Sequence, residues 1–209
     1  MPVVESYGEL AARVLGRLPS AGLTRVVAVD GRAGSGKTIF AVRLAGAVQA
    51  AGASVETVHT DDLASHDDFF GWTRRLVDGV LEPLRGGRAG EHAIYDWRAR
   101  TAEERVVVQP CDVLLLDGVG AGRRELADML AYTIWLEVNV RVAVARGLQR
   151  DIAEHGETMR AELTRFWTDR VRAEASFLAA QHTWQRADLL VDGHPSMVHD
   201  PQREFVRLV

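Results

Sequence analysis

The chain is almost without lysine. Of its 25 basic residues only one, Lys37, is a lysine, and all the others are arginines. A lysine ammonium is a compact point charge on a flexible stem, whereas an arginine guanidinium is broad and planar. The composition therefore predicts a geometric demand for an ammonium group at position 37.

Other scarcities exclude whole classes of protein. With a formal net charge of −4 and a pI near 6.0, the chain lacks the basic excess that nucleic acids or anionic membranes attract, and neither partner is expected. No apolar run approaches the roughly 20 residues that span a bilayer. The N-terminus lacks the basic start and apolar centre of a signal peptide, which favours a cytoplasmic protein. The single cysteine, Cys111, excludes an internal disulfide and is interpreted as a small core residue.

The lone lysine lies in "GRAGSGKT", residues 31–38. The pattern G-x-x-x-x-G-K-[ST] is the P-loop, whose backbone N–H groups surround phosphate oxygens while the lysine reaches the β- and γ-phosphates. The hydroxyl of Thr38 would then be a Mg²⁺ ligand. The loop thus predicts ATP and Mg²⁺ as cofactors, with the nucleotide contacted by Gly31, Ala33, Gly34, Ser35, Gly36, Lys37 and Thr38.

Strands and helices alternate along the chain, which predicts an α/β fold of the P-loop NTPase type. It has three layers, with a parallel five-stranded sheet and helices on both faces. The whole of residues 1–209 is interpreted as one domain, with an N-terminal helix at 5–18 and a core at 25–193. A capping box of Ser6 and Glu9 begins the first helix. Strands are expected at 25–30, 54–59, 113–117, 132–137 and 187–191, with an edge strand at 203–209 and a small β excursion at 94–97 and 104–109. Further helices are expected at 38–51, 69–84, 123–130, 140–154 and 159–180.

Two acidic positions follow predicted strands, where open α/β sheets place their ligands. Asp117 ends the run "VLLLDG" in the Walker-B arrangement, which orients Mg²⁺ or its waters. The alternative is an aspartate that caps the turn before Gly118. Asp61 lies two residues past the second strand and is placed to accept a hydroxyl proton. Asp61 or the adjacent Asp62 can instead cap the following turn, and the sequence leaves the choice between them open.

In order and spacing, these motifs resemble the uridine/cytidine kinase family, kin of phosphoribulokinase and bacterial pantothenate kinase. The resemblance covers residues 25–193 and rests on "GRAGSGKT", "HTDD", "IYDW", "CDVLLLDG" and "RVAVARGLQRD". It implies that Asp61 activates the acceptor hydroxyl and acts with Lys37 and Arg150. It also implies that Tyr95 lines a nucleoside base pocket, to which Trp97 could contribute, and that Arg146 and Arg150 contact ATP. A helical lid at about 150–160, which would close over the site, is implied by the same resemblance.

The departures from the family concern the acceptor. Arg100 stands where uridine kinases have a base-pocket histidine, and the segment 63–72 is short. His155 and Glu157 stand where the family has lid arginines, although Arg160 and Arg165 could supply charge. The resemblance therefore implies an ATP-dependent phosphotransferase for a hydroxyl of a small molecule, a nucleoside or a similar compound. A homo-oligomer is compatible with this interpretation.

Alternatives remain. One is an ATP-binding P-loop protein without kinase turnover, and another is a kinase for a pantothenate-like or sugar alcohol. A GTPase is disfavoured, because only Asn139 matches its guanine motif. Residues 192–195, "DGHP", are interpreted as a plain loop or a wall of the adenine site rather than part of a metal site with His199 and Asp200. The arginine-rich segment 160–172 is interpreted as a solvated helix face.

Overall fold

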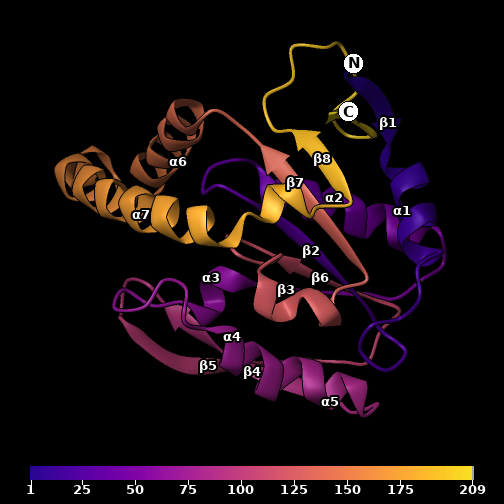
Figure 1. The fold of residues 1–209 in the computed structure, drawn as a ribbon. Helices are drawn as coiled ribbons and strands as arrows, with labels where there is room; N and C mark the ends of the chain where they lie inside the picture. The colour runs from indigo at the N-terminus through magenta and orange to yellow at the C-terminus, as the bar shows by residue number, and fades with distance from the viewer. Residues whose placement is uncertain (209) are drawn as a thin grey trace.

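The computed structural model describes residues 1–208, and its centre is a seven-stranded sheet in the order β1-β9-β8-β7-β2-β6-β3 (Figure 1). Five neighbouring strands of this sheet are parallel, as expected. They are β2 (Arg25–Gly31), β3 (Val55–His59), β6 (Val113–Asp117), β7 (Tyr132–Glu137) and β8 (Leu189–Asp192).

The sheet is covered on both faces, which gives the expected three layers. In β2, Val27 and Val29 pack in one core cluster, while Val26 and Ala28 pack in the other. Both sets are buried, as the alternation of side chains in a central parallel strand requires. The first face is covered by α1 (Tyr7–Leu15) and α2 (Lys37–Ala50), and the second by α4 (Thr73–Leu76), the π-helical η1 (Val77–Leu81), α5 (Glu82–Arg85) and η2 (Arg124–Met129).

Two long helices follow the carboxyl end of β7 and lie side by side: α6 (Val140–His155) and α7 (Arg160–Gln181), joined through η3 (Glu157–Met159) (Figure 1). The contact between them is close, because a Cβ built on Gly147 would lie 2.0 Å from the Trp167 ring. The Trp167 indole also donates to the Asp151 carboxylate at 2.7 Å. Gly147 and Trp167 thus set the distance between α6 and α7, the two helices at the predicted lid.

The N-terminal expectation was wrong in part. Val3–Ser6 form a strand, β1, and the first helix is Tyr7–Leu15, although the capping box of Ser6 and Glu9 is present. β1 pairs antiparallel with β9 (Glu204–Leu208). The strand expected near 203–209 is therefore present, but it lies between β8 and β1 and not at the edge of the sheet. The two ends of the chain meet there, and a pairing between residues some 200 positions apart leaves no local signal in the sequence.

The bounds of other helices also differ from the expected ones. The helix expected from residue 69 begins at Thr73, and the one expected at 123–130 is the 3-10 helix η2. A short helix that was not expected, α3 (Thr60–Leu63), follows β3 directly. The β excursion is confirmed as a hairpin of β4 (Gly90–Asp96) and β5 (Thr101–Val108), and a last 3-10 turn, η4, spans Thr183–Gln185.

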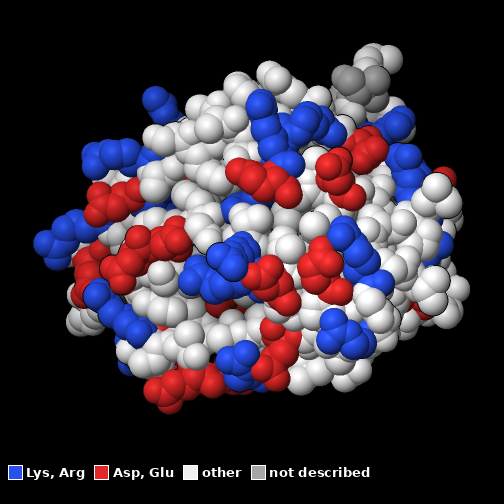
Figure 2. Space-filling view, turned by 60° about the horizontal axis from the view of Figure 1, so that its bottom comes forward, with Lys and Arg blue, Asp and Glu red and all other residues white. Residues whose placement is uncertain are grey.

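Charged side chains of both signs are interspersed on the face shown in Figure 2, without a continuous field of one sign. Among residues 1–208, none of the helices combines the length and apolar character of a membrane span.

Candidate functional site

The P-loop connects β2 to α2, and its backbone requires glycine at two points. Gly34 has φ +80°, and a Cβ there would lie 2.1 Å from the carbonyl oxygen of Ala143 at the start of α6. Gly36 has φ +98° and precedes α2 directly. The Lys37 ammonium, almost fully buried, donates to the Arg32 carbonyl at 2.8 Å. The loop thus aims the N-terminus of a 14-residue helix at the space beside it, an arrangement suited to binding phosphate.

A cavity of about 1250 Å³ opens beside this loop. It brings together most of the residues that the sequence singled out, from five separate stretches of chain. Its walls include the P-loop residues 33–38, Asp61, Asp117, Arg146 and Arg150. The segment after β8 forms a further wall with Asp192, Gly193, Pro195 and His199. The described residues contain no group of three His, Cys, Asp or Glu side chains suited to a metal.

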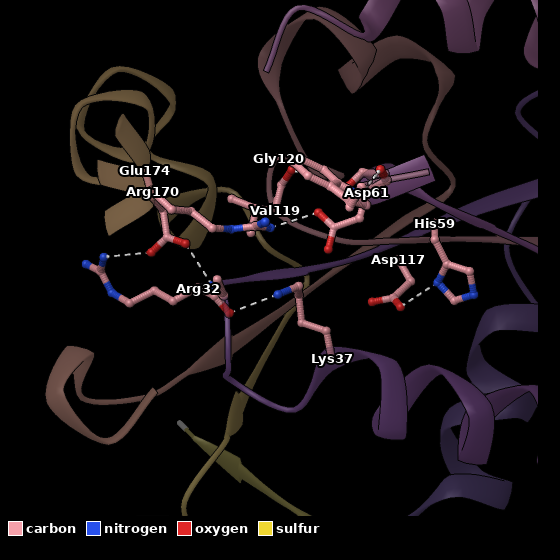
Figure 3. A network of polar contacts seen from close by, with 12 residues as sticks. Arg32, Lys37, His59, Asp61, Asp117, Val119, Gly120, Arg170 and Glu174 are labelled. Atoms are coloured by element: carbon pink, nitrogen blue, oxygen red, sulfur yellow. Dashed lines mark hydrogen bonds and ion pairs between the residues drawn. The ribbon is translucent and has the colours of Figure 1, made fainter. Parts of the chain in front are cut away.

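Asp61 projects from α3 into the cavity and pairs with Arg170 of α7, with 2.8 Å between carboxylate and guanidinium (Figure 3). The Asp61 side chain is 57% exposed and the Arg170 side chain 14%. Enclosure by the cavity walls works against ionisation of the carboxyl, but Arg170 outweighs it, assisted by Lys37 and Arg150, and the pKa of Asp61 lies below the usual range. Burial instead raises the pKa of the neighbouring Asp62. Asp61 is therefore the better-ionised carboxylate of the two.

Asp117 ends β6 and is buried, and its Oδ2 is 2.9 Å from Nδ1 of His59 at the end of β3. This hydrogen bond raises the pKa of His59. Within the described part of the chain, the other carboxylate oxygen, Oδ1, is buried without a hydrogen-bond partner. An unpaired buried carboxylate oxygen is costly, and a hard cation is a suitable partner for it. Together with Thr38 on the same cavity, the residues present therefore fit Mg²⁺.

These residues place the chain among known proteins. Residues 74–198, more than half of the chain, match the sequence model described as the Phosphoribulokinase / Uridine kinase family. The chain belongs to this family. The match includes Asp117, Arg150 and α7 but begins after the P-loop and Asp61, so the geometry of that loop is an independent observation.

Curated proteins are similar to this chain in sequence, and solved structures are similar to it in fold. A uridine kinase from Macrococcus caseolyticus is 25% identical over 161 residues, which are 69% of this chain and 77% of that protein. The structure of a possible uridine kinase from Bacillus stearothermophilus superposes with a TM-score of 0.62 at 19% identity, covering 89% of this chain and 97% of the other. D-glycerate 3-kinase from Cryptococcus neoformans superposes with a TM-score of 0.55 at 14% identity, covering 92% and 97%.

The residues that family resemblance assigned to the acceptor lie beside the cavity. Tyr95 and Trp97 belong to an aromatic cluster at the end of the β4–β5 hairpin. The Tyr95 hydroxyl is 3.1 Å from His66 Nδ1, and the Trp97 indole donates to the Asp61 carbonyl at 3.2 Å. Phe166 of α7 belongs to the same cluster and itself lines the cavity. The full cluster is His66, Phe69, Tyr95, Trp97 and Phe166.

Arg100 does not line the cavity. It occupies the hairpin turn with φ +58° and an exposed side chain. Burial lowers the pKa of His66 in the cluster, and the positive charge of Arg100 lowers it further. Its role in acceptor binding stays a prediction. On the nucleotide side, Arg146 donates to the Gly193 carbonyl at 2.7 Å, whereas Arg150 pairs with Asp151 and remains largely exposed.

Sequence reasoning missed three polar residues at this site. Asp30, at the end of β2, is fully buried and accepts N–H bonds from Gly31, Gly120 and Gly122. Burial raises its pKa, against the effect of these three bonds. It ties the loop after β6 to the start of the P-loop.

The other two missed residues, Arg170 and Glu174, lie on α7, whose arginine-rich part was interpreted as a solvated face. A signal was present. Arg170 and Glu174 follow Trp167 at helical spacing and precede Leu178 by eight and four residues, so all four share one side of the helix. The structure buries Trp167, Glu174 and Leu178. Charged residues on an otherwise apolar face indicate an internal polar partner.

Proposed function

We propose that this protein is an ATP-dependent phosphotransferase that transfers the γ-phosphate of ATP to a hydroxyl of a small molecule. One observation carries the proposal: a single cavity holds the P-loop with Lys37 on one side and the ion-paired carboxylate of Asp61 on the other. A phosphate-binding loop needs no carboxylate facing it in order to bind ATP. The carboxylate has a use where an acceptor hydroxyl must lose its proton as it attacks.

The roles of the residues follow from their positions. The P-loop amides and Lys37 hold the phosphates, and Asp61 orients the acceptor hydroxyl and takes its proton. Thr38 and Asp117 would hold Mg²⁺, which neutralises charge on the phosphates when bound. Arg170 keeps Asp61 ionised and in place. Arg150 borders the same cavity from the α6–α7 pair, which would limit the access of water as a competing acceptor.

The acceptor is proposed to be a nucleoside or a compact polar alcohol. A nucleoside is supported by the names of the curated relatives, such as the uridine kinase of Macrococcus caseolyticus, and by the aromatic cluster next to Asp61. A sugar-like or pantothenate-like alcohol is supported by the charged surroundings of Asp61, where Asp62, Arg150 and Arg170 line the cavity and Tyr95 and Arg100 do not.

A screen for acceptor-dependent ADP release tests the proposal. The purified protein with Mg·ATP is expected to release ADP rapidly with one class among nucleosides, sugars, glycerate and pantothenate-like alcohols, and slowly without an acceptor. ATP binding without stimulation by any acceptor would instead identify a P-loop protein without kinase turnover.

The Arg170–Asp61 ion pair leads to a prediction about pH. Replacing Arg170 by methionine removes the main group that lowers the pKa of Asp61, so that enclosure in the cavity is opposed by less positive charge. The pKa of Asp61 should rise, and the acidic limb of the kcat/KM profile should move to higher pH, because a general base must be ionised to act.

The matched control is Arg172→Met. Arg172 lies two residues further along α7, is 78% exposed and contacts only Asp169, at 3.7 Å, among its ion pairs in the described chain. The pH profile of kcat/KM in Arg172→Met should coincide with that of the parent. An unshifted acidic limb in Arg170→Met would show that Asp61 is not the titrating base.

A further inference from the structure

One peptide group of the P-loop is held at both ends. Its carbonyl, that of Arg32, accepts a hydrogen bond from the Lys37 ammonium at 2.8 Å. Its N–H, that of Ala33, donates to the carboxylate of Glu174 at 2.8 Å. Because a peptide group is planar and trans, fixing the N–H toward Glu174 also fixes the carbonyl on the opposite side, toward Lys37.

Glu174 is built into this position. It is buried, with its side chain 3% exposed, and it lies in α7, about 140 residues away from the P-loop in sequence. Its second oxygen is 3.4 Å from the Arg32 guanidinium, so the charge of the carboxylate is matched on the same loop. A buried carboxylate is costly unless it is paired and hydrogen-bonded, and here both conditions are met by Arg32 and Ala33.

The same helix also contacts the acceptor side of the cavity. Arg170 lies one helical turn before Glu174 and pairs with Asp61. Figure 3 shows both side chains extending from α7, one to the P-loop beside Lys37 and the other to Asp61. The position of α7 is thus coupled to the nucleotide loop and to the carboxylate that faces it.

We propose that Glu174 is a positioning residue of the P-loop: by holding the Ala33 N–H it sets the orientation of the 32–33 peptide, and through the Arg32 carbonyl it sets the resting position of the Lys37 ammonium. It touches no reacting atom. Its link to phosphoryl transfer rests on the proposed function, whereas its effect on Lys37 does not. Glu174 also keeps α7 in register, so that Arg170 meets Asp61.

The lone lysine makes the proposal measurable without nucleotide or acceptor. An amine-selective reagent modifies Lys37 and the N-terminal amine, and peptide mapping separates the two. In Glu174→Ala the 32–33 peptide is released, and the Lys37 ammonium is no longer held in place by a fixed hydrogen bond to the Arg32 carbonyl. Its labelling rate relative to the N-terminus should rise by about two- to tenfold, the range that one net hydrogen bond supports.

Two further variants separate positioning from simple support of the fold. Glu174→Gln keeps an oxygen that can accept from Ala33 and should return the Lys37 rate toward that of the parent. Glu162→Ala removes an exposed carboxylate of the same helix and should leave the rate unchanged. All variants are compared well below their melting temperatures, so that global unfolding does not contribute.

Nucleotide binding provides the second measurement. Titration calorimetry with Mg·ATP should give a Kd about tenfold higher in Glu174→Ala, because a loop whose Ala33 N–H has lost its carboxylate partner is held less well in the binding-competent conformation. A parent that binds no ATP would remove the proposed function, yet the Lys37 rates would still decide the role of Glu174. An unchanged Lys37 rate in Glu174→Ala, or equal rates in the Ala and Gln variants, would overturn the proposal.

Discussion

Replacing Asp61 by asparagine is expected to lower the rate of phosphoryl transfer by about 10²- to 10⁴-fold, the usual cost of losing a general base. Asparagine keeps the shape of the side chain and can still contact Arg170 through its amide oxygen, but it cannot take a proton. The affinity for Mg·ATP should stay within a few-fold, because Asp61 lies in α3 and shares no hydrogen bond with the P-loop in the described chain. Single-turnover kinetics and calorimetric titration measure the two effects separately.

The adjacent residue provides the control. Asp62→Asn changes a carboxylate whose pKa is raised by burial and which forms no ion pair with Arg170 in the described chain, since Arg170 pairs with Asp61. Its rate should remain close to that of the parent. Comparable turnover in Asp61→Asn and the parent, with loss in Asp62→Asn, would transfer the role of base to Asp62.

Replacing Lys37 by alanine is expected to lower the rate by about 10²- to 10³-fold, the usual cost of removing one preorganised donor from a developing charge. Lys37→Arg keeps the charge but should recover little of this loss, since the guanidinium is too broad for the space that Lys37 fills beside the Arg32 carbonyl. Steady-state assays of both variants, with melting temperatures to verify folding, distinguish a geometric demand from simple attraction.

Protection of Lys37 by bound nucleotide tests its contact with the phosphates without mutation. Saturating Mg·ATP should shield Lys37 from an amine-selective reagent, while the N-terminal amine of the same molecule stays reactive. Equal labelling of Lys37 with and without Mg·ATP would contradict its place between the phosphates and remove the basis of the proposed activity.

Much of the fold was predictable because its signals are local. Four of the five parallel strands are short and mainly apolar runs, whereas β3 is mixed, and each of the five is followed by a turn, a loop or a helix start. Strands buried on both faces are apolar throughout, and their alternation with helices is sufficient to predict a three-layer α/β arrangement. The antiparallel pair of β1 and β9 was harder to predict from the sequence. β1 is four residues long, its last two residues were assigned to the first helix, and it exists because of a partner at the other end of the chain.

The candidate site likewise contains residues that the sequence could place and a residue that it could not. The P-loop, Asp61 and Asp117 follow directly after strands, and the carboxyl ends of neighbouring parallel strands share one edge of the sheet. Sequence was therefore enough to predict that these residues meet. It was not enough to place Arg100, which stands where uridine kinases have a base-pocket histidine but lies exposed at a hairpin turn.

By itself, the sequence determined the glycine-rich loop with its single lysine, the alternation of strands and helices in the core, and the carboxylates at the ends of the strands. Only the tertiary structure decided which charged residues from distant parts of the chain contact that loop and those carboxylates. Arg170 reaches Asp61 across 109 positions and Glu174 reaches Ala33 across 141, because α7 folds back over the edge of the sheet. The physical reason is that a loop motif acts through its own backbone, whose geometry is local. The pKa of a carboxylate and the orientation of a peptide group instead depend on whichever side chains packing brings to them.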